Sequence, residues 1–307
     1  QTSMTRYFIS IGNIIIDDII LPDGSSRMGT LGGGATHAVM GMRVWSEQVG
    51  LVTPVGADFG GDQLAALAER FDLHGLVVRP HDPTPRAWQL FETDGTRNEV
   101  FRTSYEGMAA MNPQPEDLPA FYEQLAGVHL HCAPQDVTRW VPVLRQRGNP
   151  FILWEPWDPF CAPEHRPAFH ENCRLVDAVS PNLGEARHLT GLSDPLAVAA
   201  ALLEFGAPLA VLRMGAAGSL LAHSNGQRIS IPAYPAPSIV DVTGAGNAFC
   251  GGFIVGMCIT GDLQQAGWYG GVSASLALGQ FGAVYPLAGA MEEAQRRLAW
   301  YEGLSKL

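Results

Sequence analysis

The sequence predicts an α/β fold in which helices cover both faces of a central, mostly parallel β-sheet. Short apolar runs that suit buried strands alternate along the chain with segments of helical periodicity. This alternation is typical of βαβ units, in which crossover helices join parallel strands. The chain has 307 residues, 47% of them hydrophobic, which is enough to build a large core.

The expected elements interleave through the first two thirds of the chain. Strands are predicted at Tyr7–Ile11, Val49–Val55, Val128–Cys132, Phe151–Trp154 and Leu209–Leu212. Helices are predicted at Ala35–Trp45, Gln63–Phe71, Val137–Arg147, Gly184–Thr190 and Pro195–Phe205. After Ile239 the pattern changes to two long helices rich in small residues and one amphipathic helix, at Ala245–Ile259, Leu263–Phe281 and Met291–Leu304.

Two segments break this rhythm, at about residues 17–31 and 84–105, and are predicted to form a small β lid. The pieces Arg86–Glu92 and Asn98–Arg102 suit short strands, separated by a turn at Thr93–Thr96. The lid belongs to a single domain, residues 1–307, and is placed to cover a site. Its exposed edge predicts pairing across a homodimer.

Charge and cysteine content limit the partners of the chain. A net charge of −11, with only 19 lysines and arginines, excludes a nucleic-acid partner, which needs clustered basic residues. No run of about 18 apolar residues predicts a membrane span. The five cysteines form no C-x-x-C pair, which indicates reduced thiols and a cytoplasmic location. The start, Gln1–Met4, is expected to be an expression scar ahead of a native methionine rather than a signal peptide.

The segment Asp241-Val-Thr-Gly-Ala-Gly-Asn247 has the composition of a phosphate-binding loop at a helix start. Gly244, Ala245 and Gly246 precede the predicted helix, so backbone N–H groups and the positive end of the helix dipole can converge on an anion. The structural alternative is a glycine-rich helix start with Thr243 as an ordinary cap.

This segment resembles the signature of the ribokinase-like, PfkB-type carbohydrate kinases, D-x-T-G-A-G-D-x-F followed by x-x-G-F. The fixed positions that agree are Asp241, Thr243, Gly244, Ala245, Gly246, Phe249, Gly252 and Phe253. The resemblance implies a ribokinase-like fold and phosphoryl transfer from ATP, with Mg²⁺, to the alcohol group of a small-molecule substrate. Asn247 stands where the family has the aspartate that activates the acceptor hydroxyl.

Further landmarks of the family follow in the expected order over nearly the whole chain. Gly12–Asp17 resembles the first strand and its acid, Gly32–His37 the G-G-x-x-x-N cradle, Asn182–Glu185 the N-x-x-E pair, and Leu212–Gly218 the T-x-G-x-x-G element. The resemblance implies substrate contacts from Asp17, Gly33, Gly34 and His37. It implies nucleotide contacts from Asn182, Glu185, Arg213, Gly215, Gly218 and Thr243, with Gly244, Ala245, Gly246 and Asn247 in the catalytic loop.

The resemblance also implies two cation sites. Glu185 would organise Mg²⁺ through water, and Asp241 would hold a monovalent cation near Gly282 and Ala283. Phosphoryl transfer depends mostly on positioning and charge stabilisation, and therefore needs an anion cradle, a magnesium-organising acid and a lid. The sequence offers candidates for all three.

Several candidates also have a structural interpretation. Asp17 can be a turn residue or cap, and Asn182 with Glu185 a helix-capping pair. His37, which replaces the family's asparagine, is a neutral packed group, a substrate ligand or a base. Arg213, which replaces a threonine at the end of an apolar strand, faces either solvent or a phosphate.

Two strands end in polar or aromatic residues outside these motifs. His129 and His131 alternate on one strand and point to the same face; two partly buried polar groups are favoured over a metal pair, since no third ligand is evident. Trp154, Glu155 and Trp157 follow a strand at the edge where an α/β sheet opens onto its site. Tryptophans there more often belong to the core or the lip of a site.

Asn247 leaves the activity of such a kinase open. An amide takes up no proton, and loss of a general base typically costs about 10²–10⁴-fold in rate. The asparagine is either an engineered change, or natural in a pseudokinase that binds without turnover, or natural in an enzyme that needs no base there. Because His37 and Arg213 also depart from the pattern, a naturally divergent member is favoured.

Two enzymes of other classes remain as alternatives. One reuses the pocket for non-kinase chemistry with His37 or Glu155 as acid or base. The other is an oxidoreductase whose dinucleotide loop is Gly29–Gly34, but this run does not follow the first strand directly and lacks the spacing.

Overall fold

A nine-stranded sheet forms the centre of the molecule in the computed structural model, which describes residues 5–94 and 97–304. The strand order is β13-β12-β11-β10-β9-β8-β1-β4-β5. All neighbouring pairs from β5 to β11 are parallel, whereas β12 runs antiparallel to both of its neighbours, β11 and β13. The strands span β1 (Tyr7–Ile11), β4 (Val49–Gly56), β5 (Leu76–Arg79), β8 (Leu125–Cys132), β9 (Phe151–Pro156), β10 (Ala178–Val179), β11 (Leu209–Arg213), β12 (Ser219–His223) and β13 (Arg228–Ile231). The predicted α/β fold with a mostly parallel sheet is confirmed.

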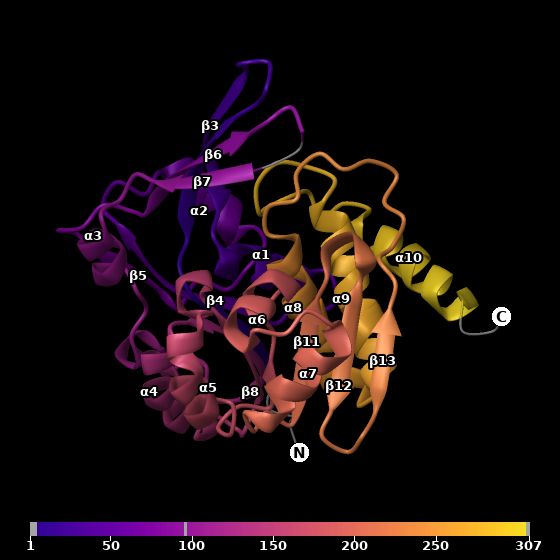
Figure 1. Ribbon diagram of the computed structural model, residues 1–307. Helices are drawn as coiled ribbons and strands as arrows, with labels where there is room; N and C mark the ends of the chain where they lie inside the picture. Colours follow the sequence, from indigo (N-terminus) through magenta and orange to yellow (C-terminus); the bar gives the residue numbers. More distant parts are fainter. Residues whose placement is uncertain (1–4, 95–96, 305–307) are drawn as a thin grey trace.

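Helices cover both faces of this sheet, and each face has its own hydrophobic core (Figure 1). On one face Met40 and Phe253 belong to a core with helices α1 (Gly34–Arg43), α2 (Gly61–Ala68), α8 (Ala245–Thr260), α9 (Leu263–Ala277) and α10 (Ala290–Leu304). On the other, Trp140 and Leu202 pack with helices α4 (Pro134–Arg145), α5 (Arg166–Asn172), α6 (Leu183–Thr190) and α7 (Pro195–Glu204). No helix in the described ranges is both long and apolar enough to cross a membrane.

A second sheet of four strands projects beyond the main one, at the top of Figure 1. Its order is β3-β2-β6-β7, with β2 (Ile15–Ile20), β3 (Ser26–Gly32), β6 (Arg86–Phe91) and β7 (Arg97–Phe101). The buried carboxylate of Asp18 in β2 pairs with Arg102, lies 3.7 Å from Arg86 and accepts a hydrogen bond from the amide of Gly29. These contacts tie the strands together from inside. Helix α3 (Tyr105–Ala110) follows, and part of the predicted turn at Thr93–Thr96 lies outside the described residues.

The start of helix α8 is held in place by close packing on helix α1. A Cβ at Gly251 would lie 1.9 Å from the carbonyl oxygen of Ala38, and one at Gly41 would lie 2.2 Å from that of Ala248. Larger side chains at these two positions would therefore push the helices apart. The glycines let the backbones approach, which fixes the first two turns of α8 against the second half of α1.

The predicted elements agree with the structure except near their ends and at the short strands. The helix predicted to reach Phe281 ends at Ala277, because the backbone carbonyl of Leu278 accepts hydrogen bonds from Val240 and Asp241 and the chain turns through Gly282. Strands β5, β10, β12 and β13 and the short helices α3 and α5 were not predicted. Short 3-10 helices also lie at Pro115–Asp117, Asp158–Phe160, Pro163–His165 and Gly215–Ala217.

Candidate active site

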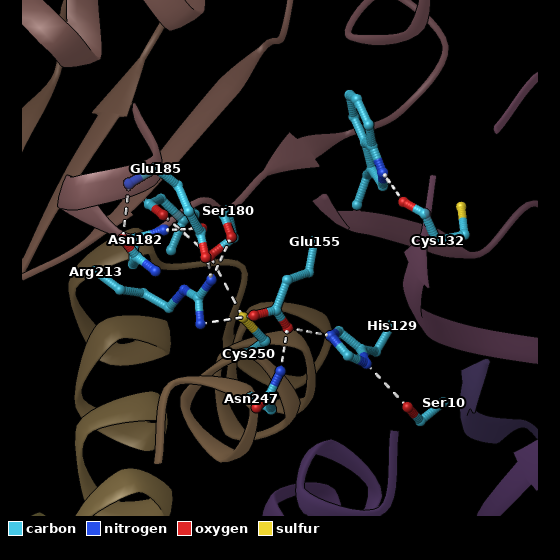
Figure 2. Close-up of polar contacts among 12 residues, drawn as sticks. Ser10, His129, Cys132, Glu155, Ser180, Asn182, Glu185, Arg213, Asn247 and Cys250 are labelled. Carbon is cyan, nitrogen blue, oxygen red and sulfur yellow. Dashed lines mark hydrogen bonds and ion pairs between the residues drawn. The ribbon is translucent and has the colours of Figure 1, made fainter. Parts of the chain in front are cut away.

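The carboxyl ends of the central strands and the first turn of helix α8 bring four polar side chains together (Figure 2). His129 comes from β8, Glu155 from β9, Arg213 from the end of β11 and Asn247 from α8. In parallel sheets the carboxyl ends of the strands share one edge, which is where such folds bind ligands. Most of the residues named from the sequence lie along this edge.

Glu155 is the centre of the cluster. One carboxylate oxygen lies 2.6 Å from Nη1 of Arg213. The other lies 2.6 Å from Nε2 of His129 and accepts a hydrogen bond of 3.0 Å from Nδ2 of Asn247. Burial opposes the charge of Glu155, but the Arg213 guanidinium and the His129 hydrogen bond outweigh it and hold the pKa of the carboxyl well below its usual range. Glu155 is therefore an ionised, fully engaged acceptor.

The same cluster has the donor atoms of a metal site but the wrong electrostatics. Donor atoms of His129, Glu155 and Cys250 lie within 4.8 Å of one another. However, the charge of Glu155 is already neutralised by Arg213, and both of its oxygens are engaged, one by Arg213 and the other by His129 and Asn247. Cys250 keeps its proton, because burial raises the pKa of its thiol, and it lies 3.3 Å from the hydroxyl of Ser180. Hydrogen bonds and an ion pair thus account for the cluster.

Arg213 lies beside the glycine loop rather than in solvent. Its Nη2 donates to the carbonyl of Ser180 at 2.9 Å and lies 3.8 Å from Glu185. A Cβ at Gly246 would lie 2.3 Å from its Nη1, so the guanidinium is packed directly against the start of α8. Its Nε is buried and has no acceptor among the described residues. A cation therefore stands next to the positive end of the helix, where an anion would bind.

The first turn of α8 has the geometry of an anion cradle. Gly244 precedes the helix with a φ of 71°, a conformation that favours glycine. Within the described part of the chain, the backbone amides of Gly246 and Asn247 donate to no protein acceptor. Thr243 is no helix cap, since its hydroxyl is buried without a partner there, while its amide donates to Asp241 at 2.7 Å. The capping alternative for Thr243 is therefore wrong.

Asn182 and Glu185 form the helix-capping pair at the start of α6. The side chain of Asn182 accepts from the amide of Glu185 at 2.9 Å, and Glu185 accepts from the amide of Asn182 at 2.7 Å. This arrangement aims Glu185 toward Arg213. Burial raises the pKa of Glu185 to about 7. Gly215 and Gly218, both at positive φ, turn the chain just beyond Arg213.

The predicted substrate side lies where the lid meets α1. The carboxylate of Asp17 in β2 is buried and accepts a hydrogen bond of 2.9 Å from Gln89 of β6. Burial raises the pKa of Asp17 to about 7. A Cβ at Gly32 would lie 1.9 Å from this carboxylate, and one at Gly33 would lie 2.3 Å from the carbonyl of Asn13. Only glycines allow so close an approach.

His37 lies beneath the glycine loop instead of opening onto the site. A Cβ at Gly244 would lie 2.0 Å from the His37 ring, which is 2% exposed. Neither ring nitrogen has a partner among the described residues. Burial lowers the pKa of His37 to about 4, so the ring is neutral at pH 7. Of the three interpretations, the packed neutral group describes this environment best.

The remaining candidates divide between core and site. Trp154 is fully buried and donates to the carbonyl of Cys132 at 3.1 Å, as a core residue does. His129 is fully buried, with Nδ1 2.8 Å from the hydroxyl of Ser10. Partly exposed His131 and Trp157 stay at the edge of the site. The run Gly29–Gly34 spans strand β3 and the start of α1, not the turn after β1, so it is no dinucleotide loop.

Comparison with known proteins identifies the family to which this chain is related. The model of the pfkB family carbohydrate kinases matches residues 6–288. A cytidine kinase of Thermococcus kodakarensis is 30% identical, over 81% of this chain and 87% of its own. An uncharacterized protein of Schizosaccharomyces pombe is 28% identical, over 90% of this chain and 85% of its own.

Solved structures agree on the fold. A ribokinase II-like protein of E. coli, solved with ATP and Mg²⁺, has a TM-score of 0.76 at 22% identity and covers 95% of this chain and 100% of its own. The matching motifs, the fold and the family model together cover nearly the whole chain. The chain therefore belongs to the pfkB family of carbohydrate kinases.

Proposed function

We propose that the protein transfers the γ-phosphoryl group of ATP to a hydroxyl of a small molecule. The observation that carries this proposal is the free cradle at the start of α8, where unpaired backbone amides meet the guanidinium of Arg213. A helix N-terminus with an adjacent arginine suits a transferring phosphoryl group, whose charge must be stabilised. Glu185 of α6 lies 3.8 Å from Arg213, beside this cradle, and Asp17 lies on lid strand β2.

The residues present fit ATP and Mg²⁺. Arg213, Gly246 and Asn247 would hold phosphate oxygens, and Gly215 and Gly218 would line the nucleotide side. Carboxylates suit Mg²⁺, and Glu185 would hold it through water while the backbone amide of Asn182 fixes the orientation of that carboxylate. Bound Mg²⁺ supplies neutralisation of the phosphate charge. Asp241, whose backbone amide lies 3.4 Å from the carbonyl of Leu278, would hold a monovalent cation beside that loop.

The acceptor that we propose is a sugar or the sugar ring of a nucleoside. The archaeal relative is described as a cytidine kinase, and Asp17 and Gln89 together offer a carboxyl and an amide to neighbouring hydroxyls. Gly33 and Gly34 would let a ring lie close to the backbone, with His37 supporting the loop from below. Asp17 accepts hydrogen bonds when ionised and donates one when protonated, which matters for a carboxyl whose pKa is near 7.

A pseudokinase is the second candidate, and Asn247 is the observation that favours it. Its amide donates to Glu155, so an asparagine suits this position better than an aspartate, which would place a second carboxylate against the first. This complementarity supports a natural residue rather than an engineered one. Acid or base chemistry by His37 or Glu155 has less support, because His37 is enclosed and Glu155 is held by three donors.

The test combines turnover with binding. ATP, Mg²⁺ and a panel of sugars and nucleosides are incubated with wild type, and ADP release is measured; melting temperatures are recorded with ATP and Mg²⁺. Arg213→Ala should lower both turnover and nucleotide-induced stabilisation, whereas Arg228→Ala, at an exposed position in β13, should change neither. A ligand at 100 times its Kd stabilises by about 2.7 kcal/mol. Stabilisation without turnover would favour the pseudokinase, and absence of both would refute the two candidates.

A further inference from the structure

We propose that Gln89 is a positioning residue that holds the Asp17 carboxylate ready to accept a hydrogen bond from the acceptor, and that Arg97 acts through it. The inference rests on the proposed kinase function, in which Asp17 contacts the acceptor. Gln89 lies on lid strand β6, which separates β2 with Asp17 from β7 with Arg97 and Glu99. In the sequence Gln89 is one residue of a predicted strand, and none of the family motifs includes it.

The amide of Gln89 joins three charged side chains of the lid. Its Nε2 donates to Oδ1 of Asp17 at 2.9 Å and to Oε1 of Glu99 at 2.7 Å, and its Oε1 accepts from Nη1 of Arg97 at 2.6 Å. An ionised carboxylate only accepts hydrogen bonds and a guanidinium only donates them, so one orientation of the amide satisfies all three contacts. Because Gln89 is also buried, it is a fixed link between the two edges of this network.

The direction of these hydrogen bonds favours an ionised Asp17 with one oxygen left over. The guanidinium of Arg97 polarises the Gln89 amide, which strengthens its N–H groups as donors. A donor on one carboxylate oxygen stabilises the ionised form of the group. The other oxygen, Oδ2, accepts from no donor in the described part of the chain, yet it is not among the enclosed polar atoms without a partner. Oδ2 therefore stays in contact with solvent and is the atom that an acceptor hydroxyl would meet.

The charges that face Asp17 leave its ionisation closely balanced. Burial raises the pKa of Asp17 to about 7. Repulsion from Glu99 of β7 and from Asp241, which precedes α8, acts in the same direction. The hydrogen bond from Gln89 and the positive charge of Arg97 act against it. The network thus decides whether Asp17 accepts a hydrogen bond from a hydroxyl at pH 7 or, when protonated, donates one instead.

The neighbouring acid Asp18 shows how a purely structural carboxylate of the lid is held. It pairs with Arg102, lies 3.7 Å from Arg86 and accepts from the amide of Gly29, so that its charge is compensated twice. These contacts already join β2 to β3 and to the ends of β6 and β7. Asp17, in contrast, has one neutral donor and one oxygen without a donor. This difference assigns a function in substrate binding, rather than in strand cohesion, to the network around Asp17.

The first experiment follows the ionisation of Asp17 by NMR and needs no substrate. Protein labelled with carbon-13 at its aspartate carboxyl groups is titrated, and the Asp17 signal is assigned by its absence from Asp17→Asn. Gln89→Met should raise the pKa of Asp17 from about 7 to about 8 or above, whereas Glu99→Gln should lower it. Glu92→Gln, at an exposed position after β6, is the matched control and should leave it unchanged. Equal titration of Asp17 in wild type and Glu99→Gln, or in wild type and a folded Gln89→Met, would overturn the proposal.

The second experiment tests whether the acceptor uses the ionised carboxylate. A rise in pKa from about 7 to about 8 reduces the ionised fraction of Asp17 at pH 7 from about half to about a tenth. Gln89→Met should therefore raise KM for the acceptor about fivefold at pH 7 and very little at pH 9, with kcat and KM for ATP changed less than about threefold at both. An equal rise at the two pH values would indicate a merely structural role and overturn the proposal. Wild type without turnover on any acceptor would refute the kinase function and the acceptor contact with it, whereas a failed titration refutes the positioning role alone.

Discussion

Asn247→Asp restores the carboxylate of the family signature, and the structure predicts that it destabilises the protein. Nδ2 of Asn247 donates to Glu155 at 3.0 Å. An aspartate would replace this donor with an oxygen, leaving two carboxylates in contact. Two unit charges 4 Å apart repel by about 4 kcal/mol at an effective dielectric constant of 20. Partial protonation of the two carboxyl groups and the positive charge of nearby Arg213 reduce this repulsion. We therefore expect the free energy of unfolding to fall by about 2–4 kcal/mol at pH 7.

The predicted loss depends on pH. Repulsion raises the pKa of the introduced aspartate in the folded state above its unfolded value of about 3.9. The folded variant therefore binds more protons than the unfolded chain, and its stability falls as the pH rises from about 4 toward 7. The stability difference from wild type should be small at pH 4.5 and largest at pH 7.5.

Urea unfolding of wild type and three variants at these two pH values tests the reasoning. Asn247→Asp should show the loss, and the double variant Glu155→Gln/Asn247→Asp should recover at least half of it, because one donor again faces one acceptor. Asn225→Asp, in the exposed turn between β12 and β13, is the control. If Asn247→Asp is as stable as wild type at pH 7.5, or is equally destabilised at both pH values, the electrostatic account is wrong.

Three further predictions concern the glycine loop, the lid acid and the lid surface. Gly244→Ala should abolish turnover and lower the melting temperature more than Gly261→Ala does. Both glycines have φ values near 70°, but only Gly244 packs on a histidine ring. An equal fall in melting temperature for the two variants would contradict this reasoning. The free energy of unfolding of Asp17→Asn, measured in urea, should exceed that of wild type by up to about 4 kcal/mol at pH 7.5 and should equal it near pH 4. The reason is that the pKa of Asp17 is about 7 in the folded state and about 3.9 in the unfolded state, so the wild-type carboxyl is destabilising only when the pH favours its ionisation. The lid exposes Val100 and Phe101, and we predict that the protein dimerises through this surface. Light scattering should give the mass of a dimer for wild type and for the control Val78→Glu, in edge strand β5, but the mass of a monomer for Val100→Glu. A monomeric wild type would refute the prediction.

The sequence predicted the elements whose signals are local. Apolar strands and periodic helices lie within a few residues of their predicted ends, because hydrophobic spacing and glycine positions are read from neighbouring residues. The two-residue strand β10 carries too little pattern to be predicted. The placement of the glycine loop at a helix start likewise followed from adjacent residues, since α8 begins at Ala245.

The partners of Glu155 had no such signal. Its carboxylate is bound by His129, which is 26 positions away, and by Asn247, which is 92 positions away. The sequence allows Arg213 to face either solvent or a phosphate, and only the pairing with Glu155 and the contact with Gly246 place it inside the site. His37 was a candidate ligand by motif, yet the loop at Gly244 covers it.

By itself the sequence determined the fold class, the order of the motifs and the position of the phosphate-type loop, because each depends on the spacing of nearby residues. Only the tertiary structure decided that Asn247 faces a carboxylate, that Arg213 lies at the start of α8, and that His131 and Asn247 both pack against Gly34. These contacts depend on which strand ends the sheet order brings side by side. Residues distant in the chain meet there, and no local pattern encodes their distances.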